Sequence, residues 1–414
     1  MTNHIYYGEY SLQHWIHLLL SKNIVLPEYQ RDFVWRAGDI KRLIRSLKER
    51  QFVQPVTIAL YKSEQTGENK NLIIDGQQRL TSILLARLGL LPDKTKFEKA
   101  EAFANGDDSD EDSSLDTEPI RWTYNELLRD AIHDNTLELV RKRAINDGRY
   151  VELIDKDLDD NFFEDTFLGF SYIVPDSNDK DEIQHSFTKL FRNINYFGMR
   201  LSPQESRKSL YFMNQDLKQF FEGRLEDGRY VLGNIKIMEN MKTVNIDFVR
   251  YLSILSQYRI NKSSSKVLLG YSAYKSRESY YADYVSFLLN IEQEDRDDKF
   301  NGFKFNETFG NNCWKQRYNK LYQALELLKS HFDLNDRHAF KSWIDADYWL
   351  FGLIYHILFR DKNLDANLTS LCSSIRDKID AKKNDLLYKR TPNGLGNIRQ
   401  RIAESINAYS KHVH

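Results

Sequence analysis

Apolar residues recur at helical spacing twice near the start of the chain. Ser11 and Asp39 each precede apolar residues three or four positions apart, which predicts two amphipathic helices capped by these residues. The two apolar stripes are Leu12, Trp15, Ile16 and Leu19, and Ile40, Leu43, Ile44 and Leu47. The opposite face of the second helix carries Lys41, Arg42, Arg45 and Lys48. This basic face is interpreted first as a solvated surface and second as a local nucleic-acid patch.

Two short apolar runs predict strands. Residues 56–60 and 72–74 have the composition of buried strands, and a polar loop over 62–70 separates them. The second run leads into the polar sequence Asp75-Gly76-Gln77-Gln78-Arg79, and helical spacing resumes over residues 80–88. A strand, a tight turn and a helix in this order predict a small α+β unit. The turn is expected at the carboxyl end of a strand, where α/β proteins often bind ligands.

Helical spacing predominates in the rest of the chain. The predicted fold class is therefore α+β, with a small N-terminal mixed sheet and its helices followed by a mainly α-helical domain. An acidic run over 105–118 has almost no apolar side chains, which predicts a disordered surface insertion. The alternative for this run is an acidic arm that mimics DNA or holds the basic helix face while the protein is idle. The predicted segments are residues 1–95, 96–120, 121–235 and 236–414.

Composition limits the classes of protein that fit. The chain has 414 residues, of which 41% are hydrophobic and 29% charged, as in ordinary globular proteins. The net charge is −1, so any nucleic-acid contact must come from a local patch. Cys313 and Cys372 are far apart and indicate a reducing compartment. With no signal-peptide pattern and no apolar run of roughly 20 residues, a cytoplasmic protein outside the membrane is expected.

The turn after residue 74 has the chemistry of a phosphate site. A helix start presents unpaired N–H groups and a partial positive charge, and Gly76 lets the backbone approach a ligand closely. Arg79 adds a guanidinium suited to phosphate, and Asp75 adds an oxygen ligand for a metal ion or a water. Gln77 or Gln78 could position a nucleophile. The structural alternative is an ordinary turn in which Asp75 caps the helix.

A second unusual run lies upstream, over residues 26–35. Tyr29, Gln30 and Arg31 combine an aromatic face with polar donors, which could clamp a base or a nucleotide. Trp35, in contrast, is interpreted as an anchor that holds this loop on the core.

A third run, over residues 191–207, carries Arg192, Asn195 and Arg207. Ser202 in this run is explained as a helix cap, with Pro203 at the first helical position. The two arginines and Asn195 have no such structural explanation. They could complete a phosphate site across the domain.

These three runs, in their order and spacing, resemble the family catalogued as domain of unknown function 262. It is the N-terminal domain of GmrSD-type modification-dependent restriction enzymes and of phosphorothioate-sensing phage-defence proteins. The third run is similar to the family's Arg-x-Asn-x-x-Gly-x-x-Leu-Ser-x-x-Glu segment, slightly expanded between Arg192 and Gly198. The resemblance covers residues 5–215, and the three runs together are specific.

The resemblance implies a ParB-like nucleotide site at the turn. It implies hydrolysis of a nucleoside triphosphate (GTP, CTP, UTP or ATP) with Mg²⁺, which Asp75 would hold. The implied catalytic residues are Asp75, Gln77, Gln78 and Arg79. The implied nucleotide-binding residues are Tyr29, Gln30, Arg31, Gly76, Thr81, Arg192, Asn195 and Arg207. In some members, the segment that corresponds to Tyr29–Arg31 is associated with the sensing of modified DNA.

The expected function is that of a sensor and nucleoside triphosphatase in a phage-defence or modification-dependent restriction system. Nucleotide state would control engagement of DNA, including modified phage DNA, or of a separate nuclease or defence subunit. Longer relatives carry an HNH-type nuclease domain. No His-centred metal site of that kind is recognisable here, so nuclease activity is not expected of this chain. The alternatives are a non-enzymatic ParB-like DNA- or protein-binding regulatory module and a nuclease with an unrecognised site. Association into a homo-oligomer is a further expectation.

Overall fold

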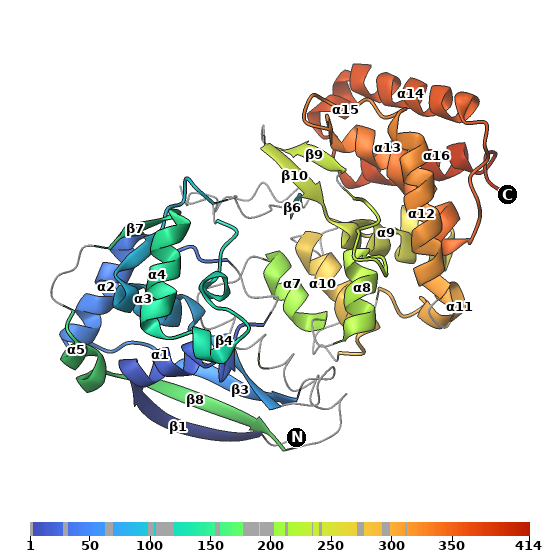
Figure 1. The fold of residues 1–414 in the computed structure, drawn as a ribbon. Helices are drawn as coiled ribbons and strands as arrows, with labels where there is room; N and C mark the ends of the chain where they lie inside the picture. Colours follow the sequence, from blue (N-terminus) through green and yellow to red (C-terminus); the bar gives the residue numbers. More distant parts are fainter. Residues whose placement is uncertain are drawn as a thin grey trace. The chain divides into compact units, whose positions relative to one another are not determined.

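A computed structural model of the chain defines two compact units (Figure 1). It describes residues 3–27, 32–62, 69–97, 103–104, 120–153, 158–176, 190, 203–211, 214–233, 235–239, 242–270, 277–291, 299–310 and 313–414. Unit 1 combines Met1–Ala100 with Asp112–Ser209, and unit 2 combines Glu101–Glu111 with Leu210–His414. Unit 1 contains a mixed sheet and unit 2 is mainly helical, which confirms the α+β class. The division of the chain into four segments stays a prediction.

A five-stranded mixed sheet organises unit 1, in the order β1-β8-β3-β4-β2. The strands are β1 (Asn3–Ser11), β8 (Phe167–Pro175), β3 (Val56–Lys62), β4 (Asn69–Asp75) and β2 (Ile24–Val25). The β1–β8 and β3–β4 pairs are antiparallel, whereas the β8–β3 and β4–β2 pairs are parallel. The two apolar runs predicted as strands are therefore neighbours, and β4 leads directly into the polar turn.

Three helices share a core with this sheet: α1 (Leu12–Leu20), α2 (Ala37–Lys48) and α3 (Gln77–Leu88). The apolar stripes predicted for the first two helices are buried as expected. Ser11 caps α1, because its hydroxyl accepts the His14 N–H. The prediction that Asp39 caps the second helix is wrong. The helix begins earlier, and the Asp39 carboxylate accepts the Arg36 N–H from the third helical position, where an acidic side chain can satisfy this donor.

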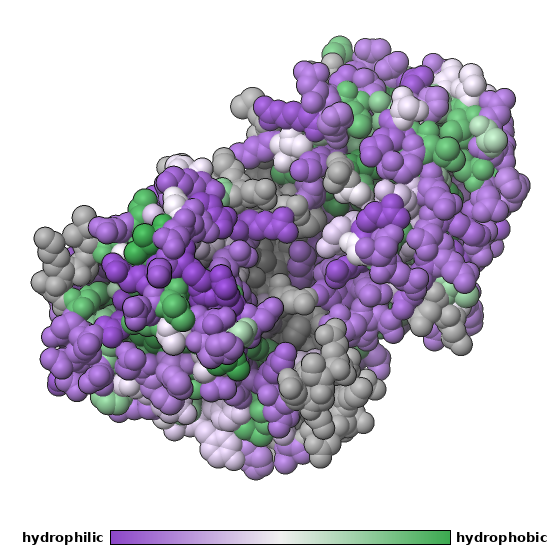
Figure 2. Space-filling model, in the orientation of Figure 1, coloured by the Kyte–Doolittle hydropathy of each residue, from purple (hydrophilic) through white to green (hydrophobic). Residues whose placement is uncertain are grey.

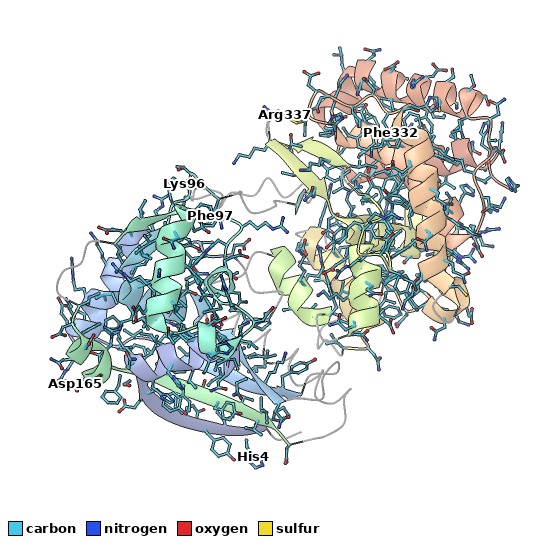
Figure 3. All side chains as sticks on the ribbon, viewed as in Figure 1. His4, Lys96, Phe97, Asp165, Phe332 and Arg337 are labelled. Carbon is cyan, nitrogen blue, oxygen red and sulfur yellow. The ribbon has the colours of Figure 1, made fainter. Side chains whose placement is uncertain are left out.

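The other described elements of unit 1 are short. They are β5 (Leu90–Pro92), η1 (Tyr124–Leu127), η2 (Ile132–Asp134), α4 (Leu137–Asp147), β7 (Tyr150–Glu152), α5 (Asp160–Asp165) and α7 (Pro203–Tyr211), whose last two residues belong to unit 2. Strand β1 forms one edge of the sheet, and its residues 4–9 are exposed on both faces. His4 on this strand is labelled in Figure 3, and its side chain is 61% exposed.

Unit 2 combines helices with a small sheet of order β11-β9-β10-β6. The strands are β6 (Phe103–Ala104), β9 (Lys236–Glu239), β10 (Lys242–Ile246) and β11 (Ala339–Phe340). The helical elements are α8 (Gln215–Glu222), α9 (Phe248–Asn261), η3 (Ser264–Lys266), α10 (Arg277–Leu288), α11 (Phe305–Phe309), α12 (Cys313–Lys329), α13 (Trp343–Ile354), the π-helical turn η4 (Tyr355–Phe359), α14 (Thr369–Asn384), α15 (Leu386–Arg390) and α16 (Leu395–Tyr409). Strand β6 lies in the predicted segment 96–120, just before the acidic run over 105–118, and that run lies outside the described residues.

The core of unit 2 is dense in aromatic side chains, as the tyrosine and phenylalanine stripes of the sequence indicate. Helix α13 and the turn η4 are buried along their whole length. At Gly352, α13 lies against α16 so closely that a Cβ atom would collide with the Tyr409 ring and the Ser405 carbonyl. Two hydrogen bonds accompany this contact: the Gly352 N–H donates to the Ser405 hydroxyl (2.8 Å), and the Tyr409 hydroxyl donates to the Trp349 carbonyl (2.9 Å).

The visible surface of each unit is mainly hydrophilic, with apolar residues in small separate groups (Figure 2). Within the part of the chain that the structure describes, none of the helices has the length and apolar character required to cross a bilayer.

Candidate functional site

Strand β4, a glycine turn and helix α3 create the candidate site. Asp75 ends the strand, Gly76 takes φ +98°, and Gln77 begins the helix. A left-handed backbone suits glycine, and here space also requires it. A Cβ on Gly76 would lie 3.0 Å from Val56 Cγ2 and 3.1 Å from Arg79 Nη2. No side chain caps α3 at Gly76, so the alternative in which Asp75 acts as a cap does not apply. The first turn keeps the anion-binding character of a helix start.

Asp75 and Arg79 form an ion pair with each other, with Arg79 Nη2 2.5 Å from the Asp75 carboxylate. The side chains are 24% and 12% exposed, respectively, so both are partly accessible to solvent. The same nitrogen lies 3.4 Å from the Pro55 carbonyl. Because both contacts use Nη2, Nη1 has no hydrogen-bond partner among the described residues and is available to an anion. Sequence reasoning gave the two residues separate tasks, and the structure brings them into direct contact.

Gln78 connects the turn to the segment that contained the second sequence run. Its side-chain oxygen accepts the Val34 N–H (3.1 Å), and its amide nitrogen donates to the Asp32 carbonyl (3.2 Å). The residue is 5% exposed. Both ends of the amide are therefore used by backbone, which gives Gln78 a positioning role for the upstream segment. Its predicted catalytic role stays a prediction.

Gln77 and Thr81 also lie in this buried part of α3, with 4% and 1% of their surface exposed. The Thr81 hydroxyl has no hydrogen-bond partner within the described residues, and neither has the adjacent Ser82 hydroxyl. Leaving buried hydroxyls unpaired costs stability, so an unpaired Thr81 hydroxyl beside a helix start favours a bound polar group at this site.

Five of the predicted nucleotide-binding residues lie outside the described residues: Tyr29, Gln30, Arg31, Arg192 and Asn195. Arg207 is described and lies buried on α7 of unit 1. The interpretation of Trp35 as an anchor is confirmed, because this side chain packs on the core of unit 1. Its neighbour Phe33 is fully buried and packs edge-on against Trp122, with ring centroids 5.5 Å apart.

A lysine that sequence reasoning missed supports the same segment. Lys94 Nζ donates to the Val34 carbonyl (3.1 Å), so Lys94 and Gln78 hold opposite ends of residue 34. Burial, together with the nearby Arg36 guanidinium, lowers the pKa of Lys94. The contact joins residues 60 positions apart, and no local pattern could have indicated it.

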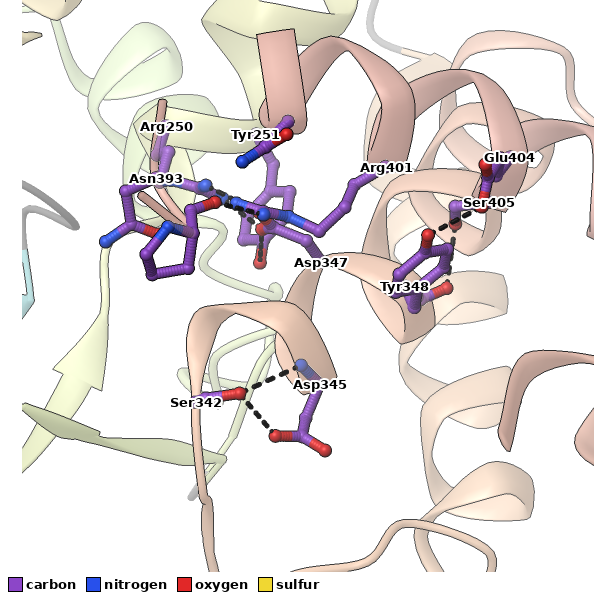
Figure 4. A network of polar contacts seen from close by, with 12 residues as sticks. Arg250, Tyr251, Ser342, Asp345, Asp347, Tyr348, Asn393, Arg401, Glu404 and Ser405 are labelled. Carbon is purple, nitrogen blue, oxygen red and sulfur yellow. Dashed lines mark hydrogen bonds and ion pairs between the residues drawn. The ribbon is translucent and has the colours of Figure 1, made fainter. Parts of the chain in front are cut away.

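A cluster of buried charges lies within unit 2 (Figure 4). Asp347 on α13 is fully buried and accepts two hydrogen bonds from Arg250, at 2.5 and 2.9 Å. Arg401 donates a third, from Nε at 2.9 Å. Burial alone would raise the pKa of Asp347, but the two guanidiniums outweigh it and hold the pKa below the ordinary value.

This cluster also holds the loop that precedes α16. Arg401 donates to the Pro392 carbonyl, and Arg277 donates to the Asn393 carbonyl. Burial lowers the pKa of Arg277 to about 10. The arrangement ties four helices (α9, α10, α13 and α16) and one loop of unit 2 together, and a structural role explains all the contacts named here. Sequence reasoning missed it because each residue alone resembles an ordinary charge on a helix surface.

The described residues contain no group of three or more His, Cys, Asp or Glu side chains placed to share a metal ion. Asp75 would thus be a single protein ligand. Mg²⁺ is compatible with such a site, since it commonly takes one or two carboxylates, with phosphate and water oxygens as the other ligands.

The turn between β4 and α3 is held to the upstream segment by Gln78 within unit 1. Residues 16–212 match the family model described as the GmrSD restriction endonuclease, N-terminal domain. This segment therefore belongs to that domain family, which confirms the resemblance drawn from the three sequence runs.

A curated relative, an uncharacterized protein of Methanocaldococcus jannaschii, is 28% identical over an alignment that covers 44% of this chain. The alignment spans 38% of the relative's length. No solved structure matches the chain.

Proposed function

We propose that this protein is a nucleotide-dependent sensor of a phage-defence or modification-dependent restriction system. The Asp75–Arg79 turn would bind a nucleoside triphosphate, and nucleotide state would control engagement of DNA or of a separate nuclease subunit. The main support is the geometry of the turn. The first turns of α3 contain a glycine-enforced helix start, a guanidinium with an unused nitrogen and an unpaired buried hydroxyl.

The donor set suits a triphosphate with Mg²⁺. The N–H groups of the first turn of α3 and Arg79 Nη1 would hold phosphate oxygens, and the Thr81 hydroxyl would add a further donor. Asp75 would hold the metal directly or through a water, and the bound ion would supply neutralisation of the phosphate charge. Because the Gln78 amide is engaged by residues 32 and 34, we assign orientation of the attacking water to Gln77.

The Asp75–Arg79 ion pair also fits this function. A guanidinium can keep one nitrogen on a carboxylate while the other contacts phosphate, because its donors form a planar fork. Asp75 would then fix the orientation of Arg79 before the nucleotide arrives. Such preorganisation is what phosphoryl transfer requires, since positioning and charge neutralisation dominate its catalysis.

The test is a binding titration with GTP, CTP, UTP and ATP in Mg²⁺, followed by a phosphate-release assay with and without DNA. We expect wild type to bind and hydrolyse at least one nucleotide, and Arg79→Ala to reduce turnover by about 100-fold or more. Arg87→Ala is a matched control. Arg87 lies on the same helix and also forms a 2.5 Å ion pair, with Asp160, so its loss should leave turnover unchanged.

The proposal fails if wild type neither binds nor turns over any of the four nucleotides. It also fails if Arg79→Ala and Arg87→Ala behave alike. Thermal unfolding of both variants checks that the fold is retained.

The closed ion pair favours one alternative as well: a non-enzymatic regulatory module that binds DNA or protein. If Asp75 remains committed to Arg79, no carboxylate is available for the metal, and nucleotide would bind without hydrolysis. Binding of a nucleotide with no phosphate release, with or without DNA, would select this alternative.

A further inference from the structure

The outer face of α2 carries a row of cations that the proposed nucleotide site does not use. Lys41, Arg42, Arg45 and Lys48 are all exposed, and they follow one another along the helix surface. Arg42 lies 3.8 Å from Asp39, and the other three form no ion pair among the described residues. Positions 41 to 48 span about 10 Å of helix axis. This row of cations, the α2 ridge, therefore holds several positive charges at the spacing of neighbouring phosphates.

An exposed aromatic side chain follows this ridge in the sequence. Phe52 follows the C-terminus of α2, and 88% of its surface is exposed, the largest value among the exposed large apolar side chains of the described residues. Because this ring is exposed to water, it contributes no buried apolar surface to the fold. Its flat face can stack on a base. It is a second observation, independent of charge, that indicates a ligand at this surface.

We propose that the α2 ridge and Phe52 form a nucleic-acid-binding surface. The lysines and arginines contact backbone phosphates, and Phe52 stacks on an unpaired base. The apolar residues of α2 are buried in the core, so the helix has no apolar face to insert into a membrane. DNA and RNA present the same phosphodiester chemistry, and the experiment below separates them.

The first turn of α3 contacts the chain on both sides of α2. Before α2, Gln78 bonds the backbone of residues 32 and 34. After α2, Arg79 contacts the Pro55 carbonyl, three residues beyond Phe52. A phosphate that engages Arg79 changes its contact with Pro55, and the loop that carries Phe52 responds. This coupling rests on the proposed function, whereas nucleic-acid binding by the ridge does not.

The test of binding uses fluorescence anisotropy with labelled single-stranded DNA, duplex DNA and RNA of one sequence, without nucleotide. The charge-reversal variant K41E/R45E/K48E should bind at least tenfold more weakly than wild type. Its plot of log affinity against log salt concentration should be shallower by about 2 to 3, because three phosphate contacts are lost. The control variant K142E/K266E/K411E has the same net charge change at three exposed lysines elsewhere, and it should bind like wild type.

Phe52 is tested separately from charge. Phe52→Ala should weaken binding of the single strand by about tenfold without changing the salt dependence, and Phe52→Trp should restore it, since both rings can stack. Equal affinity for DNA and RNA would place recognition in the phosphates and base faces alone, and a preference would identify which of the two is the partner. Equal weakening by both triple variants, or wild-type binding of polyglutamate as tight as that of nucleic acid, would overturn the proposal.

Repeating the DNA-binding measurement with added nucleotide distinguishes the nucleotide-site proposal from the α2 ridge proposal. Added nucleotide should change the DNA affinity of wild type, and Arg79→Ala should lose this response to nucleotide. If the proposed nucleotide site is wrong, nucleotide does not change the DNA affinity of wild type or of Arg79→Ala. The ridge variant K41E/R45E/K48E still binds DNA more weakly. If the ridge is wrong, nucleotide binding persists and K41E/R45E/K48E binds DNA like wild type.

Discussion

At the scale of single residues, the turn shows how one spacing can serve two purposes. Asp75 and Arg79 are four positions apart, so the start of α3 brings their side chains to the same side. The pair can orient the guanidinium for a phosphate, or it can close the site. The partial exposure of both side chains, with Nη1 of Arg79 unused, favours the first.

Gly76 provides a stability prediction with a control in the same helix. Gly89 ends α3 with φ +67°, and a Cβ there would meet nothing within 4 Å, unlike at Gly76. Gly89→Ala should cost only backbone strain, about 1 kcal/mol, whereas Gly76→Ala adds overpacking and should cost about 2–4 kcal/mol. Chemical denaturation measures both. Equal losses would mean that Val56 and Arg79 yield freely to the added methyl group.

The candidate site could be predicted from the sequence only where its members are local. The strand, Gly76 and the helix start follow from adjacent residues, and the anchoring of Trp35 follows from the cost of exposing an aromatic ring. The bonds from Gln78 to residues 32 and 34 join positions more than 40 apart. An amide gives no indication in the sequence of which backbone groups it will meet, so its role could not be foreseen.

At the scale of elements, the spacing of apolar residues predicted the amphipathic helices, which have one apolar and one polar face. The stripes of α1 and α2 were right residue by residue, because each helix buries one face only. Strand β1 was not predicted. Residues 4–9 are exposed on both faces, so they lack the alternation that identifies a half-buried strand. Pairing with β8, more than 150 residues away, defines this strand instead.

The π-helical turn η4 provides a prediction for pH dependence. His356 lies in this turn, and its Nε2 is 2.9 Å from the Ile406 carbonyl. Burial lowers the pKa of His356 below its ordinary 6.5. The folded state therefore favours the neutral ring, so its contribution to stability is complete above pH 6.5 and is lost as pH falls. Each unit of difference in pKa is worth about 1.4 kcal/mol.

Unfolding of wild type and His356→Gln should be compared between pH 7.5 and pH 5. Glutamine can still donate to the Ile406 carbonyl but does not titrate, so the variant should lose less stability than wild type over this range. Parallel pH profiles would show that other groups cause the acid sensitivity.

At the scale of the whole molecule, the chain has two separate hydrophobic cores, one in each unit. Proteins of this kind often unfold in more than one step. Calorimetry should resolve two transitions, with Gly76→Ala lowering one and Asp347→Asn the other. The second variant leaves Arg250 and Arg401 buried without their carboxylate, at a cost of about 3–5 kcal/mol. A uniform shift of both transitions by either variant would show that the cores unfold as one.

The near-zero net charge is also a property of the whole molecule, and it determines the electrostatic field that the protein presents to DNA. A charge of −1 gives no long-range field toward DNA, so contact must depend on local features such as the α2 ridge. Binding would then be strongly sensitive to salt and weak in the absence of other contacts. A sensor benefits from such an arrangement, because a nucleotide-dependent change in one surface can decide whether DNA is held.

The close contact between α13 and α16 restricts the substitutions that this chain can accept at the crossing. Only a hydrogen atom fits at position 352, between the backbone of one helix and a tyrosine ring of the other. Neither helix can accept a bulkier residue at the crossing unless its neighbour gives way in the same step. One of the clashing atoms is the backbone carbonyl of Ser405, so no side-chain change on α16 can make room, and a larger residue at position 352 requires the two helices to move apart.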